Sequence, residues 1–166
     1  MNDNDPGTDP AKELPGSITT VHRYELRLPR EEAWRLISDV SNYRNWWPWL
    51  RVFDGAALAP GEEWRCAVQP PVPYLVRFRV VIENVETGVR VQARVSGDVV
   101  GAATLRIEDT ANGCTATLDS TLAPGNTALR TMSRFAGPIA RFGHDWVLDS
   151  GARQFVTRAV EPLVGD

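Results

Sequence analysis

The feature that most constrains the fold is a long series of alternating strands followed by one amphipathic helical segment. From about residue 50 to residue 123, apolar and polar side chains alternate with a period of two, which is typical of half-buried strands. After Ala123-Pro124-Gly125-Asn126 the period changes to that of a helix. One face of this helical segment then carries Leu129, Met132, Phe135, Ile139, Phe142 and Trp146. This order predicts a curved sheet that grips the helix, with an apolar hollow between them.

The connections between the strands favour antiparallel pairing. Short breaks at Ala59-Pro60-Gly61, Thr87-Gly88, Gly97-Asp98 and Asn112-Gly113 separate the runs, and none holds a crossover helix. Asn112-Gly113 is the strongest hairpin signal and predicts a two-residue turn with both residues at positive φ. One parity of the runs is apolar and the other carries arginines and acidic residues. We therefore expect one covered face and one solvated face.

The region before the sheet predicts one strand and two short helices. Ile18 to Leu28 alternates like a half-buried strand, and Arg30 to Val40 follows with apolar residues at helical spacing. A second short helix is expected through Tyr43 and Asn45. It should end within Trp46-Trp47-Pro48-Trp49, because a proline disfavours helical geometry at the preceding residue.

Length and composition fit one domain. The chain has 166 residues, of which 43% are hydrophobic, and a domain of this size buries enough surface for a substantial core. Residues 1–16 offer little to bury and are expected to form a flexible tail, so the domain is placed at residues 17–163. Gly137-Pro138 should kink or restart the final helix. The predicted class is α+β: a bent antiparallel sheet of about seven strands around a long C-terminal helix, with two short helices after the first strand.

Several classes of function have no support in the sequence. A net charge of −3 without a basic cluster argues against a nucleic-acid partner, and no apolar run is long enough to span a membrane. The N-terminus lacks the pattern of a secretory leader, so we expect a cytoplasmic protein. Cys66 and Cys114 fit neither a metal site nor a disulfide framework, and motifs for nucleotides, metalloproteases and serine esterases are missing. We predict no cofactor and no metal; the oligomeric state stays open.

Three stretches carry a family resemblance. They are Arg30-Glu31-Glu32-Ala33-Trp34, Tyr43-Arg44-Asn45-Trp46-Trp47-Pro48 and Gly143-His144-Asp145-Trp146-Val147-Leu148. With the order of elements, they resemble the START/Bet v 1-like (SRPBCC) superfamily over about residues 17–160, and within it the bacterial polyketide cyclase/dehydrase-like group. The glycine-rich loop of the plant pathogenesis-related branch has no counterpart. Cone-shaped folds of the ketosteroid isomerase type are disfavoured, because their helices come mainly first.

The resemblance implies a helix-grip fold with a cavity between the sheet and the long helix. Members of this superfamily mostly bind lipids, sterols, polyketides, quinones or hormones there, and only some are enzymes. The resemblance also implies that a ligand contacts inward strand residues and the long helix, but it supplies no common catalytic set.

Three polar residues on inward parities are candidates for proton transfer. His22 and Tyr24 share one side of the first strand, and an imidazole titrates near neutral pH, although a hydrogen-bonded histidine at a strand end is the simpler interpretation. Ser120 interrupts an apolar parity, so its hydroxyl needs a partner: the backbone by default, or else Tyr24 or a ligand oxygen. His144 and Asp145 point about 100° apart on a helix and do not form a dyad.

The predicted ligand contacts combine inward strand residues with the long helix. They are Tyr24, Trp64, Phe78, Val80, Val91, Leu105, Ser120, Met132, Phe135, Ile139 and Trp146. The cluster of Trp46, Trp47 and Trp49 either lines the cavity or plugs the open end of the sheet, and the sequence favours neither role.

The main hypothesis is reversible binding of a small hydrophobic molecule that is lipid-, polyketide- or quinone-like. The alternative is an enzyme of the polyketide cyclase/dehydratase type that uses the same cavity, with His22, Tyr24 or Ser120 moving protons. A third possibility, an interaction module with a packed interior, predicts no cavity at all.

Overall fold

The computed structural model describes residues 14–71, 74–127, 130–131 and 137–164. The predicted flexible tail therefore stays a prediction, and the kink at Gly137-Pro138 falls at the limit of a described range. The elements in chain order are β1 (Ile18–Leu26), α1 (Arg30–Ser38), the 3₁₀ turn η2 (Val40–Asn42), α2 (Tyr43–Trp46), β2 (Leu50–Asp54), β3 (Glu63–Val68), β4 (Val76–Glu86), β5 (Arg90–Gly97), β6 (Val99–Thr110), β7 (Gly113–Pro124), α4 (Gly137–Phe155), the π-helical turn η3 (Val156–Val160) and α5 (Glu161–Val164).

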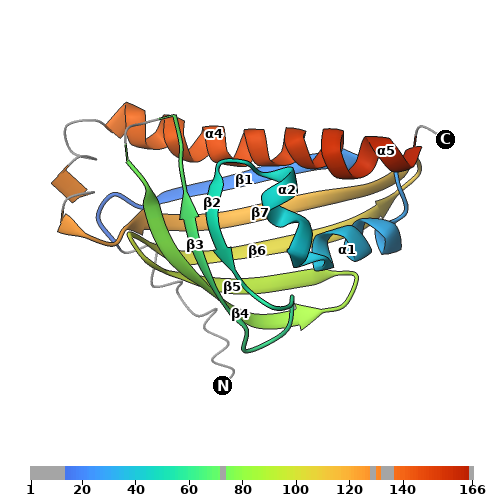
Figure 1. Ribbon diagram of the computed structural model, residues 1–166, viewed down its shortest axis with the longest axis horizontal. Helices are drawn as coiled ribbons and strands as arrows, with labels where there is room; N and C mark the ends of the chain where they lie inside the picture. Colours follow the sequence, from blue (N-terminus) through green and yellow to red (C-terminus); the bar gives the residue numbers. More distant parts are fainter. Residues whose placement is uncertain (1–13, 72–73, 128–129, 132–136, 165–166) are drawn as a thin grey trace, which may run out of the picture.

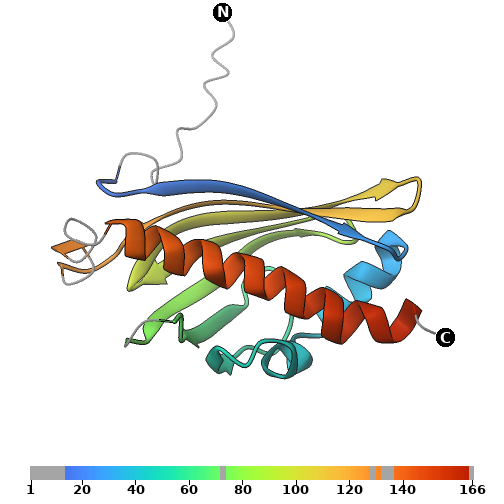
Figure 2. The same ribbon diagram turned by 90° about the horizontal axis from the view of Figure 1, so that it is seen from above.

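The seven strands form one antiparallel sheet in the order β1-β7-β6-β5-β4-β3-β2. The sheet curls into a half-barrel with β1 and β2 at its edges, and α4 lies across the open side between them (Figures 1 and 2). Register shifts between Leu50 and Val52 and between Ile82 and Asn84 interrupt β2 and β4, and such bulges bend a strand. The predicted helix-grip fold of the α+β class is confirmed.

The two faces of the sheet largely follow the predicted alternation, and β7 shows a clear departure from it. On the concave face Val91, Ala93 and Val95 are buried, as the apolar parity of β5 requires. On the convex face of β7, however, Thr117 and Thr121 are also buried. Because β7 lies between β1 and β6, side chains from the neighbouring strands cover it. The hydroxyl of Thr121, for example, meets that of Thr19 on β1 at 3.1 Å.

The hairpin between β6 and β7 forms, but its predicted turn is wrong in detail. Thr110 pairs with Gly113, so the two-residue loop is Ala111–Asn112, and only Gly113 has a positive φ, of 144°. A Cβ on Gly113 would lie 2.1 Å from the carbonyl oxygen of Leu26. The glycine is therefore required where the turn passes the end of β1, a long-range contact that local turn preferences do not contain.

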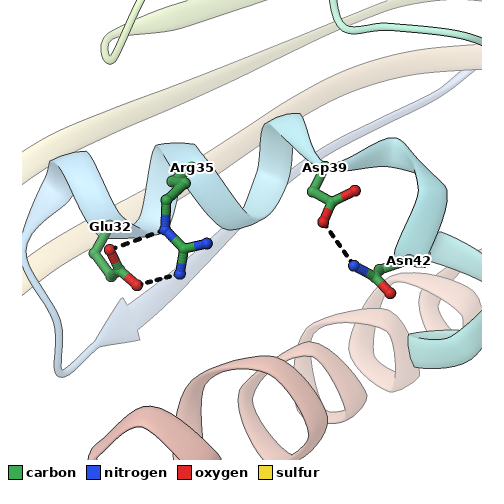
Figure 3. Close-up of polar contacts among 4 residues, drawn as sticks. All are labelled: Glu32, Arg35, Asp39 and Asn42. Carbon is green, nitrogen blue, oxygen red and sulfur yellow. Dashed lines mark hydrogen bonds and ion pairs between the residues drawn. The ribbon is translucent and has the colours of Figure 1, made fainter.

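The first helix ends two residues earlier than predicted, at Ser38. Its buried side carries Ala33 and Leu36, and polar contacts occupy its outer side. Arg35 Nε donates to Glu32 Oε2 at 3.1 Å, and Asn42 Nδ2 donates to Asp39 Oδ2 at 2.6 Å across the turn into η2 (Figure 3). These contacts lie on the exposed side of α1 and at the turn that leads to α2.

Candidate ligand-binding cavity

An apolar cavity of about 380 Å³ lies between the concave face of the sheet, the segment from α2 to β2, and α4. This volume is within the range of roughly 300–1,000 Å³ that small-molecule sites occupy. None of the described residues on its wall carries a formal charge. Aromatic side chains form much of the wall: Tyr43, Trp47, Trp49, Phe53, Trp64, Tyr74 and Phe78.

The cavity occupies one end of the half-barrel. Gly16, Pro70, Tyr74, Val99 and Pro124 on its wall all flank or end strands on the same side of the sheet. This is the end that lies away from α1 in Figure 1.

The other end of the half-barrel is packed solid. Leu26 of β1, Ala33 of α1 and Ala159 of η3 are buried in one core cluster. Ile107 and Cys114 of that cluster are 1% and 0% exposed. A curled sheet with short helices under one end only therefore leaves the opposite end hollow.

Trp47 and Trp49 line the cavity and also attach the α2–β2 segment to α4. The indole Nε1 of Trp47 donates to the carbonyl oxygen of Gly151 at 2.8 Å, and that of Trp49 donates to Oε1 of Gln154 at 3.0 Å. Trp46 turns the other way and packs edge-on against Phe155 in the core, with ring centroids 5.3 Å apart. Two members of the cluster thus form wall, and the third is core.

Four of the aromatic residues on the wall, Tyr43, Trp47, Trp49 and Trp64, already donate to protein partners. The hydroxyl of Tyr43 donates to the carbonyl oxygen of Ile37 at 2.6 Å, and Nε1 of Trp64 donates to that of Ala57 at 2.9 Å. Burial raises the pKa of the Tyr43 phenol, and it raises the pKa of the Cys66 thiol to about 12. Both groups are therefore neutral at physiological pH.

Ser120 is the one aliphatic hydroxyl among the described residues of the wall. Its Oγ lies 3.0 Å from Oγ1 of Thr20, which stands directly opposite on β1. The partner expected by default, the backbone, is therefore not the one observed. Thr20 could not be predicted as the partner of Ser120. The two residues are 100 positions apart, and no local sequence pattern gives the register between β1 and β7.

His22 and Tyr24 are not part of the cavity wall. Nδ1 of His22 lies 3.6 Å from Oδ1 of Asp149, and the hydroxyl of Tyr24 donates to the carbonyl oxygen of Leu148 at 3.3 Å. Burial, followed by the nearby charge of Asp149, raises the pKa of Tyr24 to about 12. The two side chains connect β1 to α4, and their predicted roles toward a ligand stay predictions.

The remaining predicted contacts divide by their position along the half-barrel. Trp64, Phe78 and Val80 lie on the wall. Val91 and Leu105 do not, because they pair with each other further along β5 and β6, in contact with the packed core.

Of the predicted ligand contacts on the final helix, the structure describes only some side chains. Trp146 stacks edge-on behind Trp49 at 6.4 Å, and its neighbours Val147 and Leu148 face the cavity instead. Met132 and Phe135 lie outside the described residues, as do the side chains of Ile139 and His144. A ligand contact at any of the predicted positions stays a prediction.

Two features of the described residues bear on the class of site. No three His, Cys, Asp or Glu side chains among them come close enough together to hold a metal ion. Among the described helices, none combines the length and apolar character that crossing a bilayer demands.

A curled antiparallel sheet closed by a C-terminal helix over an apolar hollow defines a helix-grip protein. Comparison of the sequence with protein families agrees with this class. The chain belongs to the family described as "Polyketide cyclase / dehydrase and lipid transport", which matches residues 17–160. No curated protein matches the sequence.

Solved structures with the same fold are distant in sequence. The di-domain ARO/CYC protein BexL from the BE-7585A biosynthetic pathway is 12% identical, with a TM-score of 0.68 over 87% of this chain and 50% of that chain. A protein from Thermus thermophilus is 12% identical, with a TM-score of 0.64 over 86% and 99%. Ara h 8.0201 is 8% identical, with a TM-score of 0.55 over 86% and 99%. At these identities the likeness concerns the fold alone.

Proposed function

We propose that this protein reversibly binds a small hydrophobic molecule in the cavity between its sheet and α4. The observation that carries the proposal is the cavity of about 380 Å³, whose described wall is uncharged and largely aromatic. Transfer of apolar ligand surface from water to such a wall contributes roughly 25 cal/mol per Å², before the costs of association are subtracted. The family description, which includes lipid transport, supports the same role.

A steric test uses two adjacent alanines of β6. Ala103 lies on the cavity wall, whereas Ala102 belongs to the opposite parity and pairs with Arg94 and Thr121. Ala103→Phe should place a ring inside the cavity and reduce binding of the neutral probe N-phenyl-1-naphthylamine at least tenfold in equilibrium dialysis. Ala102→Phe adds the same ring outside and should leave binding unchanged. Equal binding by both variants and the unsubstituted protein would contradict the proposal.

A second candidate is cyclisation or dehydration of a polyketide-like substrate, which the family description favours. The cavity would hold a flexible chain in a reactive shape, and that effect alone accelerates reactions. The described wall, however, contains no His, Asp or Glu, and His22 is engaged with Asp149 outside it. The wall therefore supports binding more strongly than proton transfer.

The two candidates are separated by recovering the bound molecule. A carrier should return an added poly-β-ketone unchanged, as judged by mass spectrometry, and an enzyme should return a cyclised or dehydrated product. If product forms, His22→Ala tests His22 directly: loss of turnover with product binding intact would assign the proton transfer to this residue. Turnover that survives in His22→Ala would exclude His22 as the acid or base.

A further inference from the structure

Four aromatic residues of the cavity wall use their hydrogen-bond donors on the protein itself. An indole has a single donor, and those of Trp47, Trp49 and Trp64 are all bonded to groups outside the cavity. The hydroxyl hydrogen of Tyr43 is likewise used, on the carbonyl oxygen of Ile37. A ligand can therefore obtain no donated hydrogen bond from these four residues without breaking a bond within the protein.

Ser120 differs from these aromatic residues, because its hydrogen bond with Thr20 leaves part of the hydrogen-bonding capacity of its hydroxyl unused. A hydroxyl has one donor and two acceptor sites, and either oxygen of the pair can be the donor. If Thr20 donates, the O–H of Ser120 is left for a ligand carbonyl. If Ser120 donates, its lone pairs are left for a ligand hydroxyl. Ser120 is only 6% exposed and lies beside the small side chain of Ala103, its partner on β6.

The same wall disfavours a charged ligand. None of its described residues supplies a counter-charge. A carboxylate or ammonium group placed there loses its hydration without gaining an ion pair from these residues, which is a large cost.

We infer that the ligand is an uncharged, largely apolar molecule with one carbonyl or hydroxyl group. This group forms a hydrogen bond with Ser120, on the part of the cavity wall that β7 provides. This inference rests on the proposed function, since it names the chemistry that the same cavity accepts. Ser120 acts as the polar anchor that orients the ligand, and the aromatic wall supplies the affinity. Cavities of this kind generally combine an apolar lining with few polar groups.

Three naphthalene probes of similar shape test this inference by equilibrium dialysis at pH 7. They are 2-acetonaphthone, its hydrocarbon isostere 2-isopropenylnaphthalene, and the anion 2-naphthoate. The protein should bind the ketone about five- to tenfold more tightly than the hydrocarbon, as expected for one net hydrogen bond. It should bind the anion more weakly than either.

Two variants assign the preference for the ketone to Ser120. Ser120→Ala should bind the ketone and the hydrocarbon equally, with affinity for the hydrocarbon retained. Thr20→Val removes the partner but keeps the serine hydroxyl, so the preference for the ketone should persist. This second variant controls for disturbance of the β1–β7 pairing.

Other outcomes overturn the inference without touching the proposed function. A ketone preference that survives in Ser120→Ala, or that is lost instead in Tyr74→Phe at the wall, removes Ser120 from its role. Tight binding of 2-naphthoate refutes the uncharged class. If none of the three probes binds, and N-phenyl-1-naphthylamine does not bind either, the proposed function fails and the inference fails with it.

Discussion

At the scale of single residues, the reactivity of the Cys66 thiol depends on how well the cavity wall is shielded from water. Its thiol lies on the wall, and burial raises its pKa to about 12. The thiolate is the reactive form, so a raised pKa lowers reactivity at every pH below it. At pH 8 the thiolate fraction is then about a thousandfold below that of an exposed cysteine.

We predict that Cys66 in a Cys114→Ala background reacts about a thousandfold more slowly with iodoacetamide at pH 8 than a free cysteine peptide does. Cys114 is itself buried, and its removal leaves one thiol to follow. Mass spectrometry measures the rate. An apolar ligand in the cavity should slow it further, and a rate near that of the peptide would show that water reaches the wall freely.

Strand parity was sufficient to place several wall residues in advance. Trp64, Phe78, Val80 and Ser120 face the cavity, as alternation along their strands predicts. Parity predicts which face of the sheet a side chain lies on. It does not predict where along the strand the packed core ends and the cavity begins. For that reason Val91 and Leu105, on the correct face, lie against the core instead.

At the scale of elements, the α2–β2 segment meets α4 at Gly151. A Cβ at this position would meet Cζ2 of Trp49 at 3.4 Å and Nε1 of Trp47 at 3.7 Å, which are ordinary contact distances. The site therefore tolerates one methyl group. Alanine is also favoured over glycine inside a helix by about 1 kcal/mol.

Gly151→Ala should accordingly raise the free energy of unfolding by about 0.5–1 kcal/mol, measured by urea titration. Gly151→Leu adds the same helix preference but cannot fit between the two indoles, so it should destabilise the protein and weaken ligand binding together. If Gly151→Ala also destabilises the protein, the tryptophans pack against α4 more closely than the distances at Gly151 indicate.

The order of helices and strands could be predicted from the sequence, but the details of the contacts between elements could not. Alternation, proline positions and helical spacing indicated β1, α1, α2 and the hairpins. The hydrogen bond from Trp47 to the carbonyl oxygen of Gly151 joins positions 104 residues apart, and no local pattern encodes it. Gly151 inside the final helix was visible in the sequence, but its contact with the two indoles appears only in the structure.

At the scale of the whole molecule, stability and binding occupy opposite ends of one half-barrel. Ile107 belongs to the packed end and is 1% exposed, whereas Leu122 borders the cavity. Removal of a side chain from a tightly packed site leaves a new void, which adds to the loss of burial. Removal next to an existing hollow creates little additional void.

We predict that Ile107→Ala lowers the free energy of unfolding by about 3–4 kcal/mol and that Leu122→Ala lowers it by roughly half as much. Urea titrations of both variants, analysed with equal slopes, measure the difference. Leu122→Ala should in addition enlarge the cavity and favour bulkier probes. Equal losses would mean that both ends are packed alike.

Trp47, Trp49 and Trp64 are three of the six tryptophans in the chain, and all three border the hollow. The protein thus has intrinsic fluorophores at the position where a ligand would bind. Quenching or a shift in emission wavelength would register an occupant without any label. Extracts and compound collections can therefore be screened against the unmodified chain, and the molecule itself would indicate which chemistry it accepts.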